Sequence, residues 1–138
     1  MMKQLSDYEP YENYYHFVGS AKYRKNLFYS EDIRLSLQKI IQEVLEKKGI
    51  EVAAVTVAYN HVHVLLRSEL SPSQIGMTLF GASSRFLRQE YPILVQEAEK
   101  GLWGGRSWKA IRDEAHLEHC RSYIQRHLPD NTKMDEAI

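Results

Sequence analysis

The sequence has little of what marks several large classes of protein. It contains one cysteine, Cys120, so no disulfide can form within the chain, and a disulfide-stapled secreted domain is excluded. Its apolar runs are short: Val62–Leu66 is interrupted by His63 and falls far short of the ~20 residues that cross a bilayer, so no membrane partner is expected. Met1–Pro10 is polar and acidic and lacks the apolar stretch of an export signal, which predicts a cytoplasmic protein.

An excess of charge of either sign is also missing. The 18 basic and 18 acidic residues cancel, so the molecule as a whole is not built to attract a polyanion over a distance. Two local runs, Ala21–Leu27 and Gly101–Arg112, nevertheless carry basic residues and no acid. Such runs fit a nucleic-acid surface, but a solvated surface of mixed charge explains them more simply, so charge alone does not assign a partner.

What is present suffices for one folded domain. With 138 residues, 43% of them hydrophobic, the chain can bury its own core, and no linker or repeat divides it. We therefore expect a single domain over residues 1–138, with a core at about 14–128 and flexible ends. The local patterns predict a strand at 14–19, a helix from a cap at Ser30 to Gly49, strands at 50–59 and 61–67, a helix from Ser71 to Pro92, a strand at 107–111 after a break at Gly104-Gly105, and a helix from Asp113 to about Leu128. This order is typical of an α+β domain in which helices cover an antiparallel sheet.

The pair His61 and His63 is the first feature that suggests chemistry. In a strand, residues two apart point to the same face, so the two imidazoles are expected to be neighbours while Val62 faces the core. Two neutral imidazoles a few ångströms apart suit a divalent metal. Because such a pair is common in strands, it fits a structural role as well.

The last predicted helix adds a polar stripe at helical spacing, formed by His116, Cys120, Tyr123 and His127. In one interpretation, a tyrosine and a histidine simply lie at the boundary of the core. In the other, His127 is a third metal ligand and Tyr123 is a nucleophile. A phenol has a pKa of about 10, so it attacks phosphorus well only where a cation assists or a base removes its proton.

Five segments follow one another in an order that resembles a known family. They are Lys22-Tyr23-Arg24, Asn60–Leu66, Ser73-Gln74-Ile75 with Gly81–Arg85, Leu102-Trp103-Gly104 with Trp108, and Tyr123–His127. Together they resemble the single-tyrosine transposases of small insertion sequences, which carry a His-hydrophobic-His (HUH) motif, and their relatives associated with repetitive extragenic palindromes. The resemblance extends over about residues 14–128.

The resemblance implies a ferredoxin-like, IS200-like transposase fold and a definite reaction. Such enzymes cut and rejoin single-stranded DNA, leaving a 5′-phosphotyrosine and a free 3′-hydroxyl; they use Mg²⁺ or Mn²⁺, recognise hairpin ends and act as homodimers. By position, His61 and His63 match the metal ligands and Tyr123 matches the nucleophile. The family's usual third ligand is an amide, whereas this chain has His127, which would favour Mn²⁺ over Mg²⁺ or act as a base to Tyr123.

The resemblance also suggests a use for basic residues. The expected phosphate contacts are Lys22, Arg24, Lys25, Arg85 and Arg88. Trp103 and Trp108 are predicted to be core or dimer-interface residues, with stacking on unpaired bases as the alternative. Structural roles are expected for His16, His119 and Cys120, and an exposed or edge-strand position is expected for Tyr8, Tyr11, Tyr14 and Tyr15.

Two other functions compete with transposition. A replication initiator or relaxase-type nickase uses the same chemistry, but such proteins are generally larger and have a different chain order. A non-catalytic ferredoxin-like module would bind nucleic acid or a small ligand, and its histidines would be incidental. The sequence leaves open which hairpin is recognised, whether the protein is mobile or domesticated, and whether the tyrosine helix docks in cis or in trans.

Overall fold

The computed structural model describes residues 8–131, so the ends expected to be flexible lie partly outside the described residues. Its elements are β1 (Tyr14–Ala21), the 3₁₀ turn η2 (Lys22–Arg24), α1 (Glu31–Glu46), β2 (Glu51–Val57), β3 (His61–Arg67), α2 (Pro72–Gly76), the π-helical η3 (Met77–Ala82), α3 (Ser83–Glu90), α4 (Ile93–Glu97), β4 (Trp103–Ala110) and α5 (Glu114–Gln125). None of the helices in this range is long and apolar enough to span a membrane.

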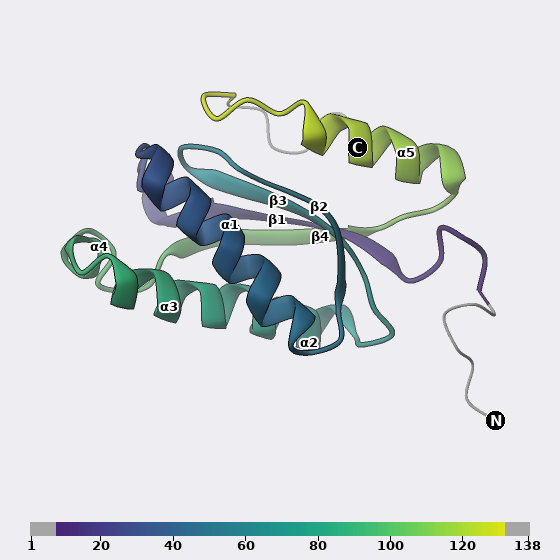
Figure 1. The fold of residues 1–138 in the computed structure, drawn as a ribbon, viewed down its shortest axis with the longest axis horizontal. Helices are drawn as coiled ribbons and strands as arrows, with labels where there is room; N and C mark the ends of the chain where they lie inside the picture. The colour runs from purple at the N-terminus through teal and green to yellow at the C-terminus, as the bar shows by residue number, and fades with distance from the viewer. Residues whose placement is uncertain (1–7, 132–138) are drawn as a thin grey trace.

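Four strands form one antiparallel sheet with the order β2-β3-β1-β4. Helices α1 and α2–α3 cover one face of the sheet, and α5 lies on the other (Figure 1). The predicted α+β class is therefore confirmed, and the strand order is that of a ferredoxin-like domain with α5 added on the second face.

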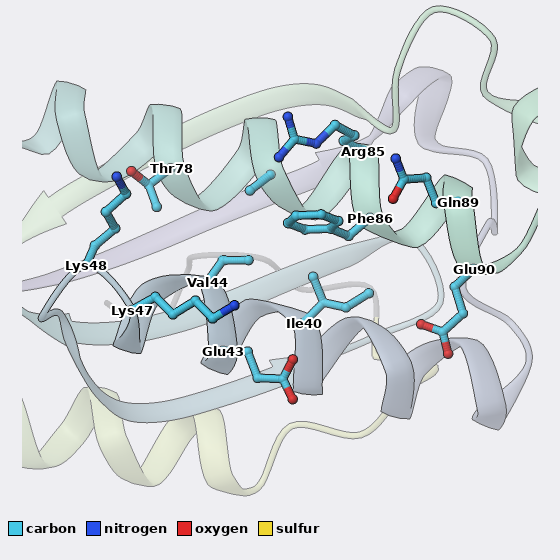
Figure 2. A pocket seen from close by; sticks show the side chains of 11 residues that line it. Ile40, Glu43, Val44, Lys47, Lys48, Thr78, Arg85, Phe86, Gln89 and Glu90 are labelled. Carbon is cyan, nitrogen blue, oxygen red and sulfur yellow. The ribbon is translucent and has the colours of Figure 1, made fainter.

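The two faces of the sheet have different cores because side chains alternate along each strand. On β3, Val62, Val64 and Leu66 belong to the larger apolar core under α1 and α2–α3. Leu65 belongs to a smaller core under α5, and His61 and His63 share that face by their parity. A groove of about 620 Å³ lies between α1 and α3, on the side of the sheet away from α5. Figure 2 shows the side chains that line it.

The predicted end of α1 and the predicted start of α2 agree with the structure. Gly49 has a φ of +74° where α1 ends, and the N–H of Ile50 donates to the carbonyl of Leu45, as in a glycine-capped helix end. Ser71 forms a full capping box with Gln74 at the start of α2. Ser30 occupies the N-cap position of α1, although its side chain makes no capping hydrogen bond.

Two predictions about strands were wrong. Gly104 and Gly105 lie inside β4, which begins at Trp103, because without a Cβ they pass close to the neighbouring chain: a Cβ on Gly104 would lie 3.0 Å from the Cα of Lys22. Tyr14 is not at an edge, because β1 is an inner strand between β3 and β4; its side chain is buried in the smaller core. Tyr15 likewise lies on the inner strand and is half-buried. The short helix α4 was not predicted.

Candidate active site

His61 and His63 lie side by side on the inner strand β3, and both are fully buried. Their ring centroids are 5.2 Å apart and the ring planes are nearly perpendicular, at 86°. The prediction that both imidazoles share a face opposite Val62 is thereby confirmed. Burial beneath α5 removes both rings from bulk water.

His127 joins this pair from a different position than predicted. Helix α5 ends at Gln125 rather than near Leu128, so His127 lies beyond the helix and not on its polar stripe. The chain leaves the α-helical repeat here, because the N–H of His127 donates to the carbonyl of Ile124, three residues back, whereas the bonds of an α-helix reach four residues back. The carbonyl of Pro129 accepts a hydrogen bond of 2.8 Å from the N–H of Tyr59, which holds this segment against the β2–β3 turn.

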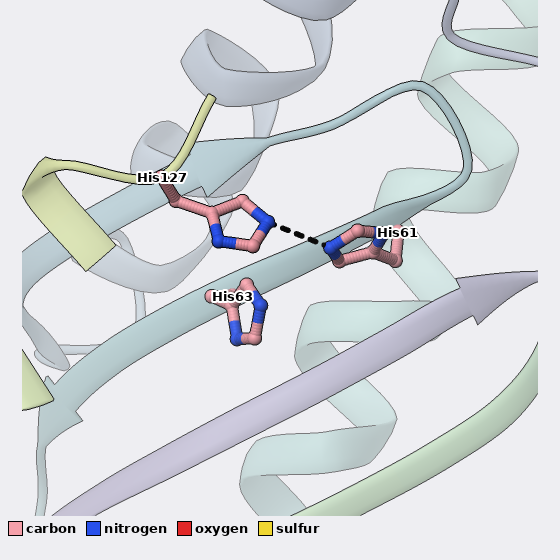
Figure 3. A group of neighbouring side chains, drawn as sticks. All are labelled: His61, His63 and His127. Atoms are coloured by element: carbon pink, nitrogen blue, oxygen red, sulfur yellow. Dashed lines mark hydrogen bonds between the residues drawn. The ribbon is translucent and has the colours of Figure 1, made fainter. Parts of the chain in front are cut away.

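The three imidazoles fit a metal ion. Each of His61, His63 and His127 offers a nitrogen, and these atoms lie within 4.8 Å of one another. The Nε2 atoms of His61 and His127 are 2.9 Å apart (Figure 3). Two ligands at right angles on an ion, each at about 2.1 Å, would be about 3.0 Å apart. Because the donors are imidazoles, the site suits a first-row transition ion better than Mg²⁺.

Hydrogen bonds define which nitrogen of His61 carries the proton. Its Nδ1 lies 2.8 Å from Oδ1 of Asn60, and an amide oxygen can only accept, so Nδ1 donates and Nε2 presents a lone pair. Nε2 of His127 therefore donates to Nε2 of His61. The buried Nδ1 of His127 has no hydrogen-bond partner among the described residues. If His127 binds a metal through Nε2, the ring proton has to move to Nδ1, where it makes no hydrogen bond, and this costs free energy.

Tyr123 lies on α5 directly beside this cluster. Its ring centroid is 5.4 Å from that of His63 and 5.4 Å from that of His127. The side chain is half-buried and packs against the smaller core. The tyrosine and the three histidines thus come together within one chain.

His16 is part of the cluster, although the sequence predicts only a structural role for it. Its Nε2 lies 2.9 Å from Nδ1 of His63, and the two rings stack with centroids 5.1 Å apart. Burial, followed by the charges of His116 and Lys109, lowers the pKa of His16 to about 3, so the ring is neutral. In the sequence, the only sign of this role is a histidine in an otherwise apolar predicted strand. The contact with His63 could not be predicted, because it depends on the register between β1 and β3, which is not a local property of the sequence.

Burial favours the uncharged form of three other groups on or just after α5, namely His116, Cys120 and His127. Burial lowers the pKa of His127, and it also lowers that of His116, with a smaller contribution from Arg112. Burial raises the pKa of the Cys120 thiol to about 12, so this thiol is an unreactive core group, as predicted.

The five basic residues predicted to contact phosphate come from two separate parts of the chain, the turn after β1 and helix α3. Lys22 and Lys25 donate to the carbonyls of Lys100 and Glu97, at 3.1 and 3.5 Å, and Arg24 is exposed between them. This turn follows β1 directly, where the N–H of Ala21 donates to the carbonyl of Asn60. It therefore lies near the His61 end of β3.

The remaining two basic residues lie on the face of the sheet opposite α5 and the histidines. Arg85 and Arg88 belong to α3, and Arg85 extends over the Phe86 ring at 4.7 Å in the groove facing α1 (Figure 2). Trp103 is buried and donates from Nε1 to Ser83, which confirms the core interpretation. Trp108 is 49% exposed on the edge strand β4.

Comparison with known proteins gives a consistent result for most of the chain. Residues 10–127 match the family model described as "Transposase IS200 like". The chain is 32% identical over 123 residues to the ISDra2 transposase TnpA of Deinococcus radiodurans, covering 86% of this chain and 83% of that protein. It is 30% identical over 126 residues to the transposase for insertion sequence element IS200 of Salmonella typhimurium, covering 90% of this chain and 82% of that protein.

Solved structures share the fold. A crystal structure from Deinococcus radiodurans, assigned as a transposase, superposes with a TM-score of 0.69 at 24% identity over 90% of this chain and 96% of that one. The REP-associated tyrosine transposase, solved bound to a REP hairpin, superposes with a TM-score of 0.59 at 17% identity over 89% of this chain and 70% of that one. At these identities, the superpositions show the common architecture alone.

Proposed function

This chain belongs to the IS200-like transposase family, and from that membership we propose that it cuts and rejoins single-stranded DNA through a covalent bond to Tyr123. One observation carries the proposal: the Tyr123 ring lies 5.4 Å, between centroids, from a histidine of a buried three-imidazole cluster in the same chain. A phenol needs a nearby cation or base to act as a nucleophile, and this cluster can provide either.

Cleavage proceeds by exchange of one phosphate ester for another. The phenolic oxygen of Tyr123 attacks the scissile phosphorus, the bond from phosphorus to the 3′ oxygen breaks, and the phenolic proton is balanced by the proton that the 3′ oxygen takes up. The products are a 5′-phosphotyrosine and a free 3′-hydroxyl. Rejoining is the reverse, with a 3′-hydroxyl attacking the phosphotyrosine. Because the site is compact and lies beneath α5, the cleaved strand has to be unpaired.

His61 and His63 are proposed to hold a divalent ion, Mn²⁺ in preference to Mg²⁺, with His127 as a third ligand. When bound, such an ion draws charge from a phosphoryl oxygen and stabilises the leaving 3′ oxygen. His127 has an alternative role as the base that accepts the phenolic proton, since its ring centroid is 5.4 Å from that of Tyr123. The two roles of His127 predict opposite results when it is replaced by an amide, which can ligate but cannot act as a base.

The proposed substrate is single-stranded DNA with hairpin ends, and the proposed assembly is a homodimer. A relative that shares the fold is solved with a REP hairpin, which supports this choice of substrate. Backbone contacts are proposed for Lys22, Arg24, Lys25, Arg85 and Arg88. The whole range 1–138 is proposed to act as one domain in the cytoplasm.

A denaturing gel tests the function. Purified protein is incubated with Mn²⁺ and single-stranded hairpin oligonucleotides from the DNA that flanks its gene, and a covalent adduct is expected. Tyr123→Phe should abolish the adduct, whereas Tyr14→Phe, a matched change on the same side of the sheet, should leave it intact. An adduct that persists in Tyr123→Phe overturns the proposal. Hairpin binding without any adduct in the natural sequence would instead favour a non-catalytic binding module.

A further inference from the structure

Resting on the proposed metal site, we infer that His16 is a positioning residue of that site: it holds His63 through Nδ1, so that Nε2 of His63 is the nitrogen offered to the metal. Neither the resemblance nor the spacing of the histidines assigns His16 such a role. It lies 45 residues before His61 along the chain, on a different strand.

The sheet places the two rings in contact. β1 and β3 are neighbouring inner strands, and Val18 on β1 is the Cα partner of His63. His16 is two residues from Val18, so its side chain lies diagonally beside His63 on the same face. The rings are close to parallel, at 19°, and the distance from Nε2 of His16 to Nδ1 of His63 is 2.9 Å. Both side chains are buried, so water does not compete for this hydrogen bond.

The same device occurs at the neighbouring ligand. Oδ1 of Asn60 accepts from Nδ1 of His61 at 2.8 Å, so both histidines of β3 are held at Nδ1 by a separate residue. In metal sites, an acceptor on the distal nitrogen of a histidine fixes its tautomer and ring orientation. Nδ1 of His127 has no such partner among the described residues. In this site, His61 and His63 are therefore each oriented by a hydrogen bond at Nδ1, and His127 is not.

A packing role for His16 makes a different prediction. If the ring served only to fill space, phenylalanine would replace it well, since Tyr14, two residues away, shows that this face of β1 accommodates an aromatic ring. Phenylalanine lacks the acceptor nitrogen, so it would leave Nδ1–H of His63 buried without its partner. Glutamine is smaller and not aromatic, but its amide oxygen can accept the bond.

The test compares His16→Phe with His16→Gln, using Tyr14→Phe as a matched control on the same strand and face, where the facing residue is Arg67. Mn²⁺ binding is measured without DNA from the electron paramagnetic resonance signal of free Mn²⁺, and unfolding curves identify the variants that fold. We expect His16→Phe to weaken Mn²⁺ binding about 10–100-fold, His16→Gln to recover part of the loss, and Tyr14→Phe to bind as the natural protein does. A folded His16→Phe variant with unchanged Mn²⁺ affinity overturns the inference.

A second measurement needs no variant and no metal. Nitrogen-15 correlation spectra of the metal-free natural protein report which ring nitrogen of His63 carries the proton. The inference requires the proton on Nδ1, donated to His16, and a proton on Nε2 overturns it even if His16→Phe does not fold. Failure of the proposed function looks different: the natural protein would bind no Mn²⁺, while His63 would still show the Nδ1 proton.

Discussion

The two faces of the sheet differ in what they bury, although the same strands supply both. Under α1 and α2–α3, β3 contributes Val62, Val64 and Leu66 to a core of 22 buried apolar residues. Under α5, the same strand contributes two histidines beside a core of only 7. Burying imidazoles costs desolvation, whereas burying aliphatic side chains stabilises the fold. The face under α1 and α2–α3 therefore provides most of the apolar burial that stabilises the fold, and this allows the face under α5 to hold a polar site.

Substitutions on β3 should show the largest difference between the two faces, one affecting metal binding and the other affecting stability. His63→Ala removes a proposed ligand, so we expect Mn²⁺ binding and adduct formation to fall below detection while the protein stays folded. Leu66→Ala leaves a cavity in the large core and should cost about 2–5 kcal/mol of unfolding free energy. Its folded fraction should still form the adduct. Urea unfolding curves and the gel assay check both variants, and the reverse pattern would refute this division of roles.

Much of this division is predictable from sequence, because each face follows from alternation within one strand. The positions of His61 and His63 opposite Val62, and the hairpin that carries them, follow from local patterns and are confirmed. The end of α1 at Gly49 follows in the same way, from a residue that tolerates a positive φ. The catalytic and ligand roles of these residues stay predictions.

The rest of the site depends on contacts between distant segments. The pairing of His16 with His63 requires the β1–β3 register, which no local pattern contains. His127 lies beyond the end of α5 and beside His61, in a segment that the hydrogen bond from Tyr59 to Pro129 joins to the β2–β3 turn. The glycines of β4 resemble a strand break in sequence, and their close approach to the chain after β1 is visible only in the fold.

A smaller loss of stability is expected from overpacking the larger core, under α1 and α2–α3, at Gly19 of β1. A Cβ on Gly19 would lie 2.4 Å from Cε1 of Phe80 and 3.1 Å from the Trp103 ring, so Gly19→Ala forces both rings to move. We expect it to cost about 1–3 kcal/mol of unfolding free energy without changing Mn²⁺ affinity per folded molecule. Thermal unfolding together with Mn²⁺ titration tests this. Loss of Mn²⁺ binding in a variant with unchanged stability would contradict the prediction, because it would mean that a change on one face alters the histidines on the other.

The histidine-bearing face should make stability depend on pH. Burial lowers the pKa of His16 from 6.5 to about 3, so the unfolded chain binds a proton in a range where the folded protein does not. The free energy of unfolding is therefore highest above pH 6.5 and falls as the pH is lowered toward 3, by of the order of 1 kcal/mol per unit. Urea midpoints at about pH 7.5, 6 and 5 measure the slope. His16→Gln should flatten it, and an unchanged slope would assign the dependence to other groups.

The smallest effect is expected at His127. Replacement by glutamine restores the family's usual amide, so we expect Mg²⁺ to support adduct formation better relative to Mn²⁺, by about tenfold or less. Retained activity in His127→Gln identifies a ligand role, because an amide cannot accept the phenolic proton. Loss of activity with unchanged Mn²⁺ affinity identifies His127 as the base.

The most direct test of the central claim is to locate the covalent bond. The adduct formed with Mn²⁺ and a hairpin oligonucleotide is digested with nuclease and trypsin, and the nucleotide-bearing peptide is sequenced by mass spectrometry. The account predicts a phosphate ester on Tyr123, within the tryptic peptide 122–126. A nucleotide on another tyrosine, such as the exposed Tyr23, would contradict it.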